Sequence, residues 1–147
     1  MPLHKILVPM DGSDGSFRAL SLAIELAAKF NSELLLLCVY RHHSALEGSL
    51  SMVHSYGSQT PDEALSEHAK KVIEVAKKHA TDAGASTIRG FIRNGQPART
   101  IVDFANEHAV DLIAMGSRGL GDIGGFLLGS VSHKVTSLAH CACLTVK

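Results

Sequence analysis

Uninterrupted apolar runs alternate with amphipathic helical stripes along this chain, and this alternation constrains the fold more than any other feature. The first two runs cover residues 5–8, which Pro9 ends, and residues 33–40. Neither run alternates apolar with polar residues, which is typical of strands covered on both faces. The intervening segment carries apolar residues at spacings of three and four, typical of a helix lying on a sheet: Phe17, Leu20, Ile24 and Ala27. We therefore expect a strand, a helix and a second strand.

The same alternation continues to the end of the sequence. Thr60-Pro61-Asp-Glu63 has the pattern of a capping box and predicts a helix start, and Gly84 predicts its end. Further strands are expected at residues 87–92, 111–115 and 143–146, with helices after Pro97 and over residues 130–139. Strands that alternate with helices predict an α/β fold with a parallel sheet and right-handed crossovers.

Length and composition limit the function classes. A chain of 147 residues has the size of one domain, so we expect a single domain over 1–147. No stretch approaches the roughly 20 apolar residues of a membrane span, which argues against a membrane protein. Fourteen basic and fourteen acidic residues leave no broad positive field, so nucleic acid is a poor candidate partner. The N-terminus enters a strand directly, without the apolar region of a signal peptide, and we expect a cytoplasmic protein.

Cysteines and histidines suggest metal or redox chemistry at two places, and a structural interpretation is favoured at both. Cys141 and Cys143 form a CxC beside His140, but two residues apart on a strand they share one face, and no second half-site of a zinc pattern follows. Three more histidines, at 42, 43 and 54, fall within residues 41–59, an aperiodic segment expected to be a long mobile or functional loop. They lack the i, i+4 spacing of helix-borne metal ligands.

Residues 114–134 contain a glycine cluster that matches parts of two nucleotide-binding motifs. Gly119-x-Gly121-x-x-Gly124 has the dinucleotide-binding spacing, but no Asp or Glu follows Gly124 to hold a ribose. Gly124 to Ser130 has part of a Walker A loop, but the lysine that this loop needs is missing. Glycine amides at a helix N-terminus nevertheless favour an anion, and Arg118 adds a guanidinium group. The segment therefore predicts a phosphate site, with a plain surface loop as the alternative.

A second candidate lies at the end of the first strand. Asp11 follows Val8-Pro9-Met10, at the carboxyl end of that strand, where open parallel sheets bind their ligands. An aspartate before Gly-Ser also commonly caps a helix or closes a turn, so Asp11 alone leaves both interpretations open.

Together these residues resemble the universal stress protein family, in its ATP-binding (UspA-like) subclass. The family signature is Gly, two residues, Gly, nine residues, Gly and then Ser or Thr, and here it reads Gly116, Gly119, Gly129 and Ser130. The opening Ile6 to Ser13 and the Gly95-Gln-Pro97 turn also match, so the resemblance covers essentially the whole chain. Cys141-Ala-Cys143 stands where members of the family often have Pro and Val. This difference bears on the packing of the last strand rather than on the nucleotide site.

The resemblance implies a Rossmann-like fold, a ligand and an assembly. It implies one open five-stranded parallel sheet in the order 3-2-1-4-5 with helices on both faces, ATP with a phosphate-bridging Mg²⁺, and a homodimer formed through the C-terminal edge strand. The implied nucleoside contacts are Pro9, Asp11 and Val39. The implied ribose and phosphate contacts are Met115, Gly116, Arg118, Gly119, Gly129, Ser130 and Val131.

The function implied is regulatory: a nucleotide-binding stress-response protein that acts through nucleotide-dependent conformation and partner binding. Catalysis would need an oriented water and a base, and Asp122 and His133 are better explained as loop or cap residues. The alternative is a slow ATPase or an adenylating enzyme of a related adenine-binding α/β fold. The adenylating class carries Ser-Gly-Gly-x-Asp-Ser after strand one, whereas this chain has Asp11-Gly-Ser-Asp-Gly-Ser16.

Overall fold

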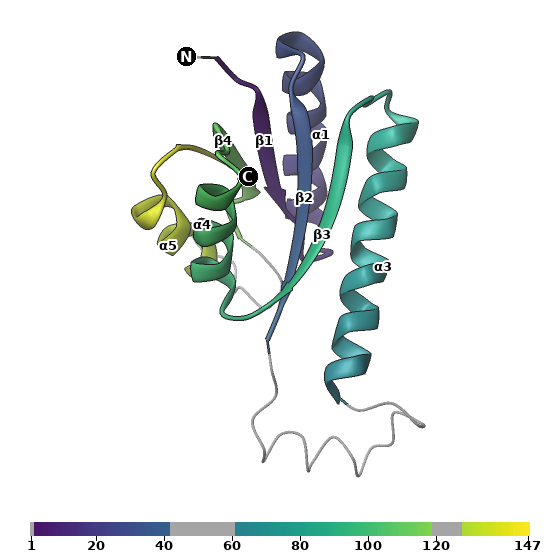
Figure 1. Ribbon diagram of the computed structural model, residues 1–147, viewed down its shortest axis with the longest axis vertical. Helices are drawn as coiled ribbons and strands as arrows, with labels where there is room; N and C mark the ends of the chain where they lie inside the picture. Colours follow the sequence, from purple (N-terminus) through teal and green to yellow (C-terminus); the bar gives the residue numbers. More distant parts are fainter. Residues whose placement is uncertain (1, 42–60, 119–127) are drawn as a thin grey trace.

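The computed structural model describes residues 2–41, 61–118 and 128–147, which form one parallel sheet with helices on both faces (Figure 1). The sheet has five strands in the order β3-β2-β1-β4-β5, as the family resemblance implied. The strands are β1 Lys5–Pro9, β2 Glu33–Tyr40, β3 Ile88–Asn94, β4 Leu112–Gly116 and β5 Ala142–Val146. The helices are α1 Asp14–Phe30, α3 Pro61–Asp82, α4 Pro97–Glu107 and α5 Ser130–Leu138. The expected fold class is confirmed.

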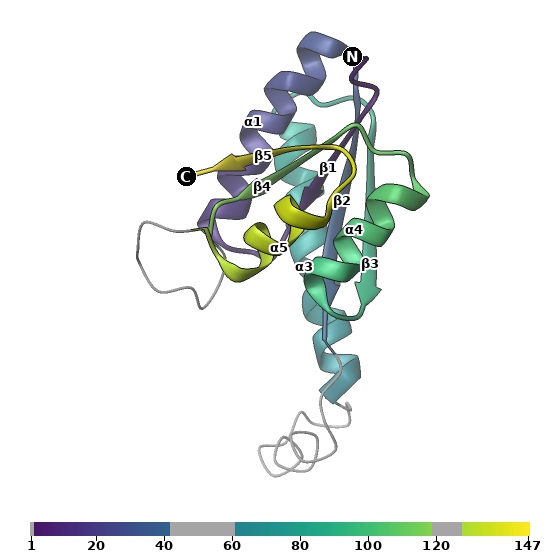
Figure 2. The same ribbon diagram turned by 90° about the vertical axis from the view of Figure 1, so that its left-hand side faces the viewer.

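Two cores explain why the strand sequences show no polar alternation. Ile6 and Val8 of β1 pack in a cluster with α1 and α3, whereas Leu7 packs in a second cluster with α4 and α5. All three side chains have no exposed surface. Figures 1 and 2 show the corresponding layers, with α1 and α3 on one face of the sheet and α4 and α5 on the other. The central strands β1, β2 and β4 must therefore be apolar on both faces.

Local capping signals place most of the helix ends. Ser13 is the N-cap of α1 and accepts a hydrogen bond from the Ser16 amide, and Asn31 ends that helix in the left-handed region at φ 56°. Gly84 follows α3 with φ +95°, a conformation that favours glycine. The expected cap Thr60 lies outside the described residues, and α4 ends at Glu107 with His108 as its C-cap.

The strand order creates a switch point between β1 and β4. These two strands are neighbours in the sheet, with Ile6 opposite Leu112, although more than a hundred residues separate them in sequence. The connection after β1 leads to α1 on one face, and the connection after β4 leads toward α5 on the other face. Their carboxyl ends therefore diverge and leave a crevice, the usual ligand position in such sheets. In the described part of the chain, no helix has the length and apolar character to cross a bilayer.

Candidate functional site

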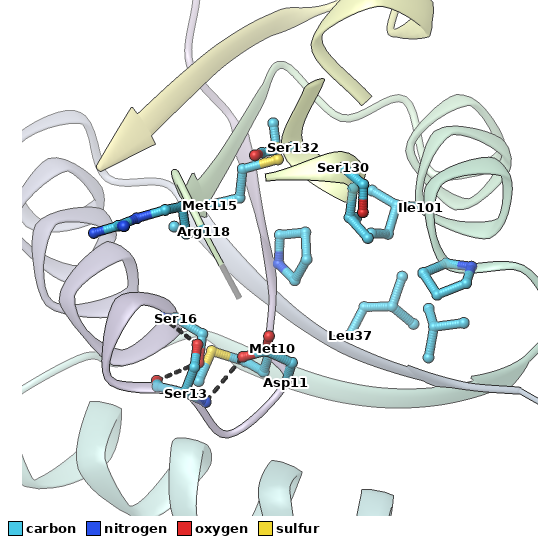
Figure 3. A pocket seen from close by; sticks show the side chains of 15 residues that line it. Met10, Asp11, Ser13, Ser16, Leu37, Ile101, Met115, Arg118, Ser130 and Ser132 are labelled. Carbon is cyan, nitrogen blue, oxygen red and sulfur yellow. Dashed lines mark hydrogen bonds between the residues drawn. The ribbon is translucent and has the colours of Figure 1, made fainter. Parts of the chain in front are cut away.

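A cavity of about 260 Å³ lies at the carboxyl ends of β1, β2 and β4 (Figure 3). The beginnings of α1, α4 and α5 complete its wall, through Ser13, Pro97 and Ser130. One part of the lining is apolar and includes Leu37, Val39 and Ile101, and another part carries hydroxyl and carboxylate groups. A flat apolar group fits the first part, and a polar or charged group fits the second.

The structure brings most of the sequence-predicted site residues to this cavity. Its lining includes Pro9, Asp11, Val39, Met115, Gly116, Arg118, Ser130 and Val131. Gly129 is not in the lining but is the N-cap of α5, directly beside it. Gly119 lies outside the described residues, as do the other glycines between 121 and 125.

Several lining residues were not expected from the sequence. They are Met10, Ser13, Ser16, Leu37, Pro97, Ile101 and Ser132. The sequence marks Pro97 only as a turn residue before a helix, and Ile101 lies within that helix. The signal available for Ser13 and Ser16 was their position after the first strand, where a helix N-terminus faces the ligand crevice.

Of the three helix N-termini at the cavity, two are closed by their own side chains. In α1, the Ser13 hydroxyl accepts from the Ser16 amide at 3.2 Å. In α4, the Gln96 side-chain oxygen accepts from the Arg99 amide at 2.7 Å. The third helix, α5, starts at Ser130 after its N-cap Gly129, and no side chain of the described residues caps it. Among the described residues, its first-turn N–H groups and the positive end of its dipole are therefore available to a ligand.

Close backbone packing fixes α1 against the end of β4. A Cβ atom added at Gly116 would lie 2.9 Å from the carbonyl carbon of Gly15, and one added at Gly15 would lie 2.9 Å from the Arg118 carbonyl oxygen. Real Cβ atoms essentially never approach backbone so closely, so both positions require glycine for space. Gly116 thus serves the packing of the cavity wall as well as lining it.

The charged residues of the cavity have distinct orientations. The Asp11 carboxylate accepts a hydrogen bond from the Ser13 amide at 2.9 Å, so it closes a turn while also lining the cavity. Arg118 is exposed, and Figure 3 shows its side chain extending away from the central group of side chains, alongside α1. Its guanidinium group is therefore not aimed at Ser130 in this structure.

The cysteines lie in environments that favour the neutral thiol. Burial, reinforced by the negative charge of Asp11, raises the pKa of Cys38 to about 11. Burial is also the main cause that raises the pKa of Cys141 and of Cys143. Because the thiolate is the nucleophile and the metal ligand, these shifts favour the structural interpretation of all three residues.

The model of the universal stress protein family matches residues 2–147 of this chain. The chain belongs to the universal stress protein family. Universal stress protein YxiE of Bacillus subtilis is 40% identical over 147 residues, which cover 98% of this chain and 99% of the relative. The resemblance noted in the sequence is therefore confirmed.

Solved structures of the family share the fold. Universal stress protein UspA from Lactobacillus plantarum superposes with a TM-score of 0.82 at 27% identity, covering 100% of this chain and 99% of that one. A universal stress protein in complex with cAMP has a TM-score of 0.75 at 30% identity, with coverages of 100% and 99%. A protein similar to this chain therefore binds an adenine nucleotide.

Proposed function

We propose that this chain is an ATP-binding universal stress protein whose nucleotide occupancy alters its conformation and its partners under stress. The observation that carries the proposal is the N-terminus of α5, which starts at Ser130 in the cavity wall and has no side-chain cap among the described residues, whereas α1 and α4 are capped by their own side chains. Phosphate is the natural ligand of such a terminus. The apolar wall with Leu37 and Val39 would hold the base, and a cAMP complex in a similar protein supports this assignment.

Magnesium would enter with the triphosphate rather than occupy a site of its own. Within the described residues, no three His, Cys, Asp or Glu side chains lie close enough together to hold a metal ion. Magnesium commonly keeps several waters and binds through substrate phosphates with one or two protein ligands. Among the lining groups, the Asp11 carboxylate and the Ser130 hydroxyl have oxygens that suit the ion. The ion would supply charge neutralisation at the phosphates.

Dimerisation through β5 and residence in the cytoplasm belong to the same proposal. β5 lies at one edge of the sheet and has β4 as its strand partner, and within residues 2–41, 61–118 and 128–147 no strand pairs with its other edge, which a second copy could occupy. The three cysteines are free thiols, which suits a reducing compartment. Light scattering of the purified protein should give the mass of two chains, and a concentration-independent monomer would contradict the dimer.

Substituting Ser130 with aspartate tests the phosphate assignment. Ser130 is the first residue of α5 and is exposed, so an acidic side chain suits the helix dipole and should not reduce folding stability. The same charge should repel a bound phosphate by about 2 kcal/mol at a separation of ~7 Å and an effective dielectric constant of ~20, or roughly thirtyfold in affinity. Calorimetric titration should show weakened ATP binding and unchanged adenosine binding.

Ser137→Asp is the matched control, because it puts the same charge about 10 Å further along the same helix. It should leave ATP affinity within about twofold of the wild type. Equal ATP affinity in Ser130→Asp and the wild type would place the phosphates elsewhere, and no detectable adenine nucleotide binding would overturn the proposed function. Release of AMP and pyrophosphate from bound ATP would favour the adenylating enzyme instead.

A further inference from the structure

Ser132 is a buried polar residue in the cavity lining, and it lies outside the glycine and serine positions of the family motif. Its relative exposure is 4%, and it lines the cavity two residues after Ser130. Figure 3 shows Ser132 near Met115, on the side of the cavity formed by β4 and α5. A buried hydroxyl needs a partner, so its hydrogen bonds show what it holds in place.

The Ser132 hydroxyl joins α5 to the chain that leaves β4. Its Oγ lies 2.7 Å from the Ser117 carbonyl oxygen and 3.1 Å from the Gly129 carbonyl oxygen. A hydroxyl group has one proton to donate, so these two carbonyl oxygens share it, and the Ser117 oxygen is the nearer acceptor. The Gly129 amide donates to the same Ser117 oxygen at 2.6 Å. The start of α5 is thus fastened to Ser117 by one backbone and one side-chain hydrogen bond.

Ser117 is itself held from the opposite side. Its amide donates to the Val146 carbonyl oxygen at the end of β5, at 2.8 Å. The open N-terminus of α5 is therefore fixed to the β4–β5 strand pair through one residue. Because a helix N-terminus binds an anion only when its N–H groups are aimed at it, this attachment decides where they point.

We propose that Ser132 is a positioning residue for the anionic part of the ligand: its hydroxyl holds the first turn of α5 at the Ser117 carbonyl, so that the N–H groups of residues 130–132 face the cavity. This inference rests on the proposed function, since it assigns the phosphate end of the nucleotide to that turn. Ser132 contributes to affinity for phosphate-bearing ligands and leaves affinity for the nucleoside unaffected.

The first test concerns the ligand-free protein and is independent of nucleotide binding. In Ser132→Ala, the amide of Gly129 should exchange with solvent at least several-fold faster than in the wild type, because the start of α5 loses one of its two hydrogen bonds to the Ser117 carbonyl. Amides of α1 and β2 should exchange as before. Unchanged exchange at Gly129 would show that the hydroxyl does not hold the turn, and would overturn the proposal.

The second test compares ligands. Calorimetric titration of Ser132→Ala should show ATP affinity reduced about fivefold, the value of one typical hydrogen bond, with adenosine affinity unchanged. Ser132→Thr keeps the hydroxyl and should restore ATP affinity, and Ser132→Cys, with a weaker donor of similar size, should fall between. Ser137→Ala is the control, because that hydroxyl also donates to a carbonyl of α5, that of His133, but on the exposed side.

The outcomes separate this inference from the proposed function. Faster exchange at Gly129 with unchanged ATP affinity would overturn the role in ligand binding while leaving the proposed function intact. Equal losses for ATP and adenosine would indicate a general structural role and also overturn it. Absence of ATP binding by the wild type would overturn the proposed function and the ligand role together.

Discussion

Substitution of Gly116 with alanine tests the backbone contact that closes one wall of the cavity. The added methyl group would lie 2.9 Å from the carbonyl carbon and 3.1 Å from the carbonyl oxygen of Gly15, and 3.3 Å from the carbonyl oxygen of Arg118. All three neighbours are backbone atoms, so no side-chain rotation relieves the contact. The first turn of α1 must move away from the end of β4.

The expected cost follows from two opposing effects. Overpacking of a rigid contact typically costs about 1–3 kcal/mol, whereas the loss of glycine flexibility in the unfolded chain returns about 0.4–1 kcal/mol. The backbone of Gly116 is not in the left-handed region, so no further strain is added. We expect the free energy of unfolding to fall by roughly 1–2 kcal/mol, and ligand affinity to fall because Gly116 lines the cavity.

Urea unfolding and calorimetric titration with ATP measure the two effects separately. Gly84→Ala is the control: it has a positive φ of +95° and open space around it, so it should lower stability through backbone strain without changing ATP affinity. The double variant Gly15→Ala, Gly116→Ala should lose less stability than the sum of the single variants, since one displacement of α1 relieves both contacts. A stability of Gly116→Ala within about 0.5 kcal/mol of the wild type would refute the reasoning.

Three further predictions concern other parts of the fold. In the folded protein the pKa of the Cys38 thiol is raised from 9.0 to about 11, so the unfolded chain loses this proton at a lower pH. The free energy of unfolding should therefore fall by up to about 2 kcal/mol as the pH rises from 9 to 11. Cys38→Val should lack this part of the pH dependence in urea unfolding. Gln96→Ala removes the cap of α4 and should cost about 1 kcal/mol by the same assay, and equal stability would contradict the cap. Asp111→Ala removes the carboxylate that accepts from the His4 and Lys5 amides, at 2.8 and 3.0 Å. The free energy of unfolding should fall by about 1–3 kcal/mol, which lowers the midpoint of thermal unfolding. An unchanged midpoint would show that these hydrogen bonds do not stabilise the start of β1.

Local signals in the sequence predict the elements well because they depend on residues close together in the chain. The run of residues 33–40 shows no polar alternation after Glu33 and forms β2 with the expected bounds, and Gln96 with Pro97 begins α4. Both cases depend on period or capping, which act within one turn or one strand. The spacing of Gly116, Gly119, Gly129 and Ser130, with matches elsewhere in the chain, identified the family, and the family model also matches the chain. The strand order was expected from this resemblance, because periodicity alone does not say which strands are neighbours.

The sequence by itself determined an α/β fold with strands buried on both faces, and a glycine-rich segment before the last helix. Only the tertiary structure decided which side chains meet at the crevice, since Pro97, Ile101 and Ser132 come from elements whose own periodicity indicates only burial or helix position. It also decided why Gly116 must be glycine, because the clash partner, Gly15, lies about a hundred residues away in sequence. The physical reason is the same in each case: sheet order and helix packing set distances between residues that no local pattern connects. Through such contacts Ser117, the end of β5 and the first turn of α5 become one hydrogen-bonded unit.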